Sequence, residues 1–261
     1  MLDTSSGHLH PLNYAIGIAG AAAEADVRIY EISPVNSYKR EASGYTVTTA
    51  NGGVVRARIV VFACNAYIGN VSRKISRTIM PFVSCIVATE PLTENVAYSI
   101  NREDIAVFDS KFCLDYYRLS SDRRLLFGGV EKYIPVDTGN IARSVRSRIL
   151  HLYPDLKNVK IEYAWGGKIA VTRNRLPSVG RIEGDIYYAQ GFSGHGVALT
   201  NIVGKVLAEM ISGTAKQFDL FASIPHKSFP GGHYLRWPAH IMTMLSLSMI
   251  DRINSRLGGI R

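Results

Sequence analysis

The chain has little cysteine and no long hydrophobic run. Its three cysteines, Cys64, Cys85 and Cys113, are an odd number and lack the CxxC or Cys/His spacing of a metal site. This pattern predicts buried free thiols in a reducing compartment rather than a disulfide framework, and no metal centre. No segment reaches the apolar length of a membrane span, and the N-terminal residues lack the basic region of a secretory signal. We therefore expect a cytoplasmic protein without a membrane span.

A concentrated basic tract is also missing, although the formal net charge is +9. The cations occur as scattered pairs such as Lys39-Arg40, Arg73-Lys74 and Arg123-Arg124. Scattered pairs are typical of a solvated surface, so we expect no nucleic-acid partner. A basic binding module for nucleic acid stays open as a hypothesis that rests on net charge alone. The hydrophobic share of 47% in 261 residues is enough for the core of one large domain or two small ones.

Hydrophobic periodicity predicts a first region that mixes a helix with strands. A helical pattern begins at Pro11, since proline suits the first helical turn, and it ends near Asp26. Apolar or alternating runs then predict strands over 27–33, 45–50, 54–58 and 59–64. Because the run 59–64 is apolar throughout, we expect it to form a central strand that is covered on both faces. Asn51-Gly52-Gly53 marks a hairpin turn between two of these strands.

A second region reads as an antiparallel sheet inserted into the first. It holds predicted strands over 82–90, 114–120, 124–130 and 160–171, and a predicted helix over 139–152. We expect the arginines of that helix, Arg143, Arg146 and Arg148, to be solvated. The pattern returns to the α/β style from Ile186. The predicted domain segments are 1–80, 81–180 and 181–225, followed by a C-terminal docking segment over 226–261. The Met-rich stretch of this last segment predicts a helix that packs on the rest of the protein.

One glycine-rich loop carries the strongest local signal. The sequence GFSGHGV, Gly191–Val197, follows the strand-like IYYAQ and precedes the helix-like ALTNIVGKVLAEMI. Glycines let a backbone approach a flat or anionic ligand without a Cβ in the way, and a following helix directs N–H groups toward it. The same spacing also suits a tight turn with no ligand, and the loop alone leaves both interpretations open.

Several segments in one order resemble a known family. They are GHLHPLNYA, VVFACNAYIG, YYRLSSDRRLLFGG, YAWGGKIAVTRNRLPSVGR, YYAQGFSGHGVALTNIVGK and IPHKSFPGG, from about Gly7 to about Asp251. Together they resemble the FAD-dependent oxidoreductases of the D-amino acid oxidase superfamily, and within it the gamma-glutamylputrescine oxidoreductase group. The resemblance implies an α/β (α+β mixed) fold, with a partial Rossmann-like FAD-binding domain and an inserted antiparallel-sheet substrate domain. It also implies FAD as cofactor and oxidation of a C–N bond by hydride transfer.

Carried onto this sequence residue by residue, the resemblance implies a cofactor-binding set. The glycine loop would lie against the flavin ring, with the helix that follows directed at the part of the ring where negative charge collects on reduction. A second loop at the end of IVVFAC and a segment before the first helix would also contact the cofactor. The implied residues are Gly7, His10, Pro11, Ala63, Asn65, Ala66, Gly191, Phe192, Ser193, Gly194, His195, Gly196, Val197 and Ala198.

The implied catalytic residues are few. Lys168 and His195 are candidates, by position, for the cation that favours reaction of the flavin with oxygen. His8 and His10 are alternative candidates for a base, but a histidine also serves as a structural hydrogen-bonding group. Amine oxidation needs little acid–base help where a neutral amine gives up hydride directly. A quinone or a protein acceptor in place of oxygen also stays open.

The substrate set follows from the antiparallel sheet. Tyr116, Tyr117 and Trp165 suit an amine stem, and Arg118 suits a carboxylate, although a sheet core with an exposed arginine explains the same residues. Ile169 stands where amino-acid-oxidising relatives carry an arginine that binds the α-carboxylate. We therefore expect a small amine whose reacting end has no carboxylate, such as a glutamylated polyamine.

The GxGxxG loop that would hold the FAD pyrophosphate is not found in these 261 residues. The sequence thus resembles the C-terminal portion of a family protein. Two hypotheses follow: a flavin oxidase portion that needs a separate N-terminal FAD-binding chain, or an inactive truncated remnant. Either predicts exposed apolar surface and an unpaired edge at strand 59–64.

Overall fold

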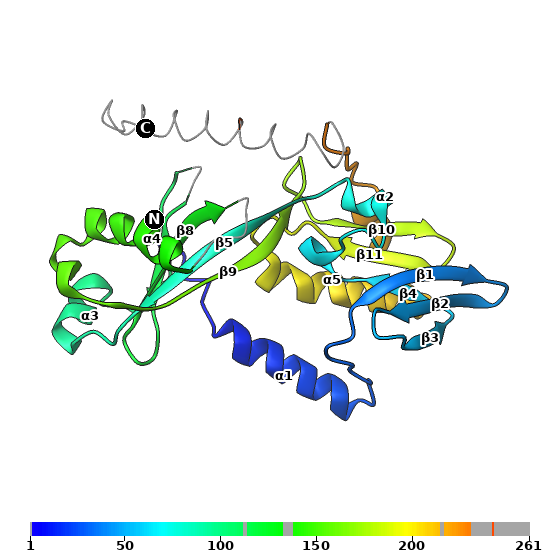
Figure 1. The fold of residues 1–261 in the computed structure, drawn as a ribbon, viewed down its shortest axis with the longest axis horizontal. Helices are drawn as coiled ribbons and strands as arrows, with labels where there is room; N and C mark the ends of the chain where they lie inside the picture. Colours follow the sequence, from blue (N-terminus) through cyan, green and yellow to red (C-terminus); the bar gives the residue numbers. More distant parts are fainter. Residues whose placement is uncertain (1, 112–113, 133–137, 215–216, 231–241, 243–261) are drawn as a thin grey trace. The chain divides into compact units, whose positions relative to one another are not determined.

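The structure, a computed structural model, describes residues 2–111, 114–132, 138–214, 217–230 and 242, and it forms two compact units (Figure 1). Among these residues, unit 1 holds 2–8, Phe82–Lys168 and 242, and unit 2 holds Leu9–Pro81 and 169–230. The mixed α/β fold class expected from the sequence is confirmed.

Unit 1 is built on an antiparallel sheet in the order β6-β7-β8-β5-β9. Figure 1 labels β8, β5 and β9 of this sheet. Two of its strands, β5 and β9, run on into unit 2 by a few residues. The elements are β5 (Met80–Thr89), α3 (Glu94–Ile100), β6 (Val107–Phe108), β7 (Tyr116–Leu119), β8 (Leu125–Lys132), α4 (Thr138–Leu152), η2 (Pro154–Asn158) and β9 (Ile161–Val171). The antiparallel strands and the helix predicted in this region are therefore confirmed.

The helix α4 covers one face of this sheet. Its buried residues Ile141, Val145 and Ile149 recur every fourth position and so form one apolar stripe. This stripe packs in one cluster with Leu125 and Phe127 of β8, both fully buried. The hydrophobic core of unit 1 therefore lies between α4 and the sheet.

Two arginines of α4 are anchored, which corrects the expectation of a solvated set. Arg148 donates from Nη1 to the Asp115 carboxylate at 2.6 Å and to the Gly129 carbonyl at 2.9 Å. Arg146 donates to the Val159 carbonyl at 2.8 Å. Helical periodicity does not show which carbonyls and carboxylates surround an arginine, because those groups come from distant segments. Arg143, in contrast, is exposed as expected.

Unit 2 holds two small sheets, in the orders β1-β2-β3 and β10-β11-β4. Its elements are α1 (Pro11–Glu24), β1 (Val35–Glu41), β2 (Gly44–Thr49), β3 (Val54–Ala57), β4 (Val60–Phe62), η1 (Asn65–Tyr67), α2 (Arg73–Ser76), β10 (Ser178–Glu183), β11 (Ile186–Gln190), α5 (Gly196–Ile211) and α6 (Phe218–Ala222). The predicted first helix and the hairpin around Asn51-Gly52-Gly53 are confirmed, since β2 and β3 pair antiparallel across that turn.

One strand prediction in unit 2 is wrong, and another is confirmed only in part. The apolar run 27–33 is irregular, and Ile32 within it is 90% exposed. Alternating apolar residues form a strand only where another strand pairs with them, and the next segment, the polar strand β1, takes the place beside β2 instead. The run 59–64 gives only the three-residue strand β4 at the end of its sheet, with Val61 40% exposed. It is an edge strand in the described part of the chain, which confirms the expected unpaired edge at 59–64 and corrects the expectation of a strand covered on both faces.

The helix α5 covers the sheet β10-β11-β4 on one side. Its buried residues Val203, Val206 and Leu207 lie at the spacing of one helical face and pack in a cluster with Tyr187 and Ala189 of β11. The glycine loop therefore connects two elements that pack against each other, β11 and α5. Their packing fixes the positions of both ends of the loop.

Of the predicted buried thiols, Cys85 is buried, whereas Cys64 is exposed because β4 ends two residues before it. Cys113 lies outside the described residues. Of the predicted docking segment 226–261, only residues 226–230 and 242 are described. Within the described ranges, no helix has the length and hydropathy needed to cross a membrane.

Candidate functional site

Two predicted cofactor loops follow neighbouring parallel strands. β4 and β11 pair in parallel, with Val60 opposite Ile186 and Phe62 opposite Tyr188. Because the strands run the same way, the segments that follow them leave the sheet at the same edge. In open α/β sheets this edge is where ligands bind. The loop with Ala63, Asn65 and Ala66 and the loop Gly191–Val197 are therefore neighbours within unit 2.

A hydrogen bond joins the two loops. The backbone N–H of Gly191 donates to Oδ1 of Asn65 at 2.9 Å. Asn65 also has a φ of +45°, in the left-handed region that asparagine tolerates better than most residues. The family resemblance implies only that Asn65 contacts the cofactor. Its side chain has a more specific role, since it fixes the first residue of the glycine loop.

The glycine loop is anchored on its other side by Ser193. The Ser193 N–H donates to the Ala170 carbonyl at 3.0 Å, and Ser193 itself has a φ of +53°. Both loops thus contain a non-glycine residue in the left-handed region, a conformation that persists only where surrounding contacts hold it. A serine within a glycine run is the sequence signal that could have indicated this anchor.

Gly191 and Gly194 of the loop have different surroundings. Gly191 has a φ of +71°, and a Cβ there would come within 2.5 Å of the Thr172 side chain. Gly194 has a φ of +94°, and a Cβ there would meet no atom within 4 Å. Gly191 is therefore required by packing inside the protein. Gly194 instead presents an open backbone face that a ligand can approach.

The helix α5 begins at the end of this loop without a side-chain cap. His195 occupies the N-cap position, is exposed, and makes no capping hydrogen bond. The first N–H groups of a helix have no earlier helical carbonyl to bind, which leaves those of Gly196 and Val197 for another acceptor. The positive end of the α5 dipole lies at the same point. The end of the loop can therefore stabilise negative charge.

Cys64 directly precedes Asn65 in the second loop. Although its surface is accessible, partial burial raises the pKa of its thiol above the usual range. A thiol with a raised pKa stays protonated at neutral pH and is a poor nucleophile. The loop therefore offers hydrogen-bonding and packing groups rather than a reactive thiolate.

In unit 1, the predicted substrate residues of β7 lie on two faces of the sheet. Tyr117 stacks on Phe127, with ring centroids 5.7 Å apart, and accepts a hydrogen bond from the Tyr153 hydroxyl at 2.6 Å. It therefore belongs to the face that α4 covers. Tyr116 and Arg118 share the opposite face, because successive strand residues alternate. The Tyr116 hydroxyl lies 3.0 Å from Ser84 Oγ, within hydrogen-bonding distance.

His8 binds Arg118. Nη1 of Arg118 lies 3.2 Å from Nδ1 of His8, and Nε2 of His8 lies 2.7 Å from the Asp104 carbonyl. An arginine only donates, so Nδ1 must accept and Nε2 must carry the proton that goes to Asp104. Both ring nitrogens are thus engaged in unit 1. His8 acts there as a support for Arg118, which favours the structural interpretation of this histidine over the catalytic one.

The remaining predicted residues lie at separate places. Trp165, Lys168 and Ile169 belong to β9, where Trp165 and Lys168 are exposed and Ile169 is half-buried. Gly7 is exposed in unit 1. His10 and Pro11 begin α1 in unit 2, and Nδ1 of His10 caps that helix by accepting from the Asn13 N–H at 3.3 Å. The structure brings together the loops after β4 and β11, and the roles of the other residues stay predictions.

No cluster of three or more His, Cys, Asp or Glu in metal-binding proximity occurs among the residues that the structure describes. The candidate site therefore consists of the two joined loops and the start of α5. Its groups are backbone N–H groups, an open glycine and the exposed side chain of His195. These groups suit a flat, electron-rich ligand that carries partial negative charge.

Comparison with known proteins defines the class. The family model for FAD dependent oxidoreductases (DAO) matches residues 1–210, and the chain belongs to this family. Over 254 residues it is 42% identical to gamma-glutamylputrescine oxidoreductase of Escherichia coli (strain K12), covering 97% of this chain and 59% of that protein. It is 40% identical over 240 residues to the probable oxidoreductase OrdL of Haemophilus influenzae, covering 90% of this chain and 54% of that protein. The chain thus spans little more than half the length of these curated relatives.

A solved structure supports the same fold. The L-proline dehydrogenase of P. horikoshii superposes with a TM-score of 0.67 at 27% identity, covering 80% of this chain and 57% of that one. The family is FAD-dependent, and the residues of the two joined loops fit the ring end of that cofactor. Gly194 leaves the space that a ring needs, and the start of α5 supplies N–H groups for a negatively charged edge.

Proposed function

We propose that the protein contributes the flavin-ring site and the substrate sheet of an amine oxidoreductase that oxidises a C–N bond. The observation that carries this proposal is the hydrogen bond between Gly191 and Asn65, which holds the two family loops side by side next to an open glycine. FAD, when bound, supplies the hydride-accepting chemistry of such a reaction. The protein has to hold the ring, orient the amine and keep water away.

The residues of unit 2 would act on the charge of the ring. Backbone N–H groups at Gly196 and Val197, with the α5 dipole, stabilise negative charge by typically ~0.3–1 kcal/mol at exposed sites and more where water is excluded. Because these groups are fixed by the packing of α5 on β11, they need no reorganisation during the reaction. His195 is the candidate for a further polar contact at this helix start.

For the substrate, we propose a gamma-glutamylated polyamine such as gamma-glutamylputrescine. The relative at 42% identity carries that substrate in its name. Ile169, which is apolar, stands where amino-acid-oxidising members carry an arginine, so an α-carboxylate next to the reacting carbon would have no partner there. Arg118 in unit 1, supported by His8, is the candidate for binding the carboxylate of the glutamyl group.

We further propose that stable flavin binding needs a GxGxxG segment outside these 261 residues, whether joined to this chain or separate. Exposed apolar surface supports this requirement. The helix α1 has no buried residue, and Ile16 in it is 60% exposed. The edge strand β4 is also available for pairing. Surface of this kind is typical of an interface with another polypeptide segment.

The test is expression of the protein together with such a segment, followed by measurement of bound flavin and its reduction under anaerobic conditions. Gamma-glutamylputrescine should bleach the flavin absorbance faster than putrescine, glycine or proline does. Anaerobic reduction is chosen because it does not depend on the electron acceptor. Faster reduction by glycine or proline would overturn the substrate proposal, and absence of flavin in the assembled protein would overturn the whole proposal in favour of an inactive remnant.

A further inference from the structure

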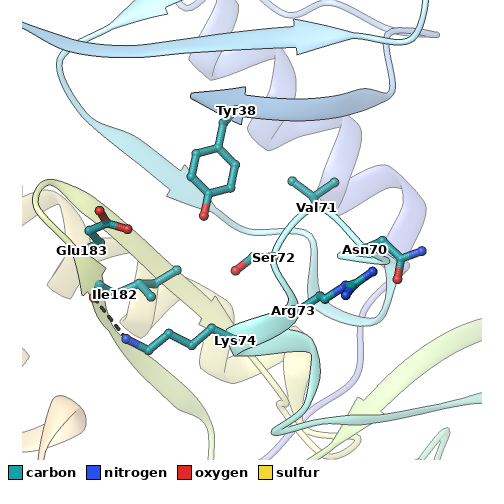
Figure 2. Close-up of a pocket in the computed structure, with 8 residues that line it drawn as sticks. All are labelled: Tyr38, Asn70, Val71, Ser72, Arg73, Lys74, Ile182 and Glu183. Atoms are coloured by element: carbon teal, nitrogen blue, oxygen red, sulfur yellow. Dashed lines mark hydrogen bonds between the residues drawn. The ribbon is translucent and has the colours of Figure 1, made fainter. Parts of the chain in front are cut away.

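A polar cavity of about 450 Å³ lies in unit 2 between strands β1 and β10 and the segment that ends in α2 (Figure 2). Its lining residues are Tyr38, Asn70, Val71, Ser72, Arg73, Lys74, Ile182 and Glu183. None of them is among the residues assigned to the candidate flavin-ring site, although Asn70, Val71 and Ser72 lie further along the connection from β4 to α2. Its volume falls in the range of about 300–1,000 Å³ that small-molecule sites occupy.

Two hydroxyl groups in this cavity lack hydrogen-bond partners. Ser72 is 5% exposed, and its side chain makes no hydrogen bond within the described part of the chain. The Tyr38 ring packs against Phe62 with centroids 5.2 Å apart, and its hydroxyl likewise has no partner among the described residues. Figure 2 shows both hydroxyls pointing into the space between them. A hydroxyl without a partner in the protein can donate a hydrogen bond to a ligand atom in that space.

The charge balance of the lining favours an anion. Arg73 and Lys74 contribute two cations, and neither forms an ion pair with an acidic residue in the described ranges. The Lys74 Nζ only reaches the Ile182 carbonyl, at 3.4 Å, as the dashed line in Figure 2 marks. Glu183 is the acidic member of the lining, and its carboxylate lies 3.6 Å from Arg40 Nη1, which offsets its charge. The cavity therefore carries a net positive charge.

We propose that this cavity is a binding site for a small organic oxyanion, a phosphate monoester or a carboxylate. Lys74 and Arg73 would neutralise the anion, and the hydroxyls of Ser72 and Tyr38 would donate hydrogen bonds to its oxygens. The polar wall formed by Asn70 and the half-buried Tyr38 ring leaves room for the organic part. The site is separate from the flavin site in its lining residues, and its occupancy does not depend on the proposed function.

The test is calorimetric titration of the full chain at low ionic strength, with glycerol 3-phosphate in one arm and glutarate in the other. Sodium chloride at the same ionic strength is the reference. Saturable binding near one molecule per chain is expected in at least one arm, and the arm that binds identifies the chemistry. Exchange of Arg73→Gln together with Lys74→Gln should weaken binding by at least about tenfold, because two charge-assisted contacts are lost.

The matched control is Lys39→Gln. Lys39 follows Tyr38 on β1, faces the opposite side of the strand, and is 80% exposed at its side chain. Its removal should leave binding unchanged. A second measurement needs no variant: the ligand should protect Lys74, but not Lys39, from an amine-labelling reagent. Lack of binding in both arms, or binding that neither the double variant nor the labelling assigns to this cavity, overturns the proposal.

Discussion

Asn65 accepts a hydrogen bond from the backbone N–H of Gly191 through its Oδ1 atom, at 2.9 Å. The two residues are far apart in the sequence and meet because β4 and β11 are parallel neighbours. This contact joins the two loops at the end of the sheet where β4 and β11 finish. The proposed flavin-ring site depends on this contact.

Replacing Asn65 by alanine should destabilise unit 2 by about 1–3 kcal/mol, because the Gly191 N–H loses its partner. Alanine also tolerates the φ of +45° less well than asparagine does. Denaturant unfolding measures the change. The matched control is Asn201→Ala on the exposed surface of α5, where the side chain makes only a 3.5 Å contact with the Val197 carbonyl. An Asn65→Ala protein as stable as the control would show that the contact does not hold the loops.

Gly191 and Gly194 of the loop should respond differently to alanine. At Gly191 the new methyl group would meet Thr172, so overpacking of about 1–3 kcal/mol adds to the cost of the left-handed conformation. At Gly194 the space is open, and we expect only the conformational cost. Flavin affinity separates the roles. Gly194→Ala should lose more flavin affinity than its loss of stability explains. If the loss of flavin affinity follows the loss of stability in both variants, Gly194 does not contact the flavin directly.

The ion pair between Arg148 and Asp115 should stabilise unit 1. Asp115 is buried, and Arg148 binds both its carboxylate and the Gly129 carbonyl. Arg148→Met should lower the free energy of unfolding by ~1–2 kcal/mol, since Lys111 still reaches Asp115 at 3.1 Å and limits the loss. Arg143→Met, on the same helix but exposed, serves as the control and should change little. Equal effects of the two variants would contradict the anchoring role of Arg148.

The pH dependence of stability should contain a contribution from His226. Burial lowers the pKa of His226 below its ordinary value of 6.5, and both ring nitrogens are shielded from solvent. The folded state therefore binds a proton less readily than the unfolded state. The contribution to stability is present above the unfolded pKa and is lost as the pH falls through the folded pKa.

The free energy of unfolding should thus decrease as the pH is lowered below about 6.5. His226→Gln should flatten that part of the curve, whereas His151→Gln, which removes an exposed histidine, should not. Urea unfolding at a series of pH values gives the comparison. A wild-type curve that stays level between neutral pH and pH 5, the range in which an ordinary histidine titrates, would contradict the prediction.

The sequence allowed the strand, loop and helix around GFSGHGV to be predicted, because alternation, glycines and helical spacing are local signals. It did not allow the anchor at Asn65 to be predicted, since that role depends on a partner more than one hundred residues away. The same reason explains the missed strand β1, whose polar sequence becomes a strand by pairing with β2. Conversely, the residues of 27–33 have strand composition but pair with no strand in the described part of the chain.

The most direct test of the central claim is an equilibrium titration of FAD into the protein assembled with a GxGxxG segment. We expect saturable binding with a shifted flavin absorbance spectrum. Asn65→Ala and Gly194→Ala should each weaken the affinity by about tenfold or more, because each removes a contact or a shape that holds the ring. Failure of the assembled protein to bind flavin, or affinities unchanged by both substitutions, would contradict the assignment of these two loops as the flavin-ring site.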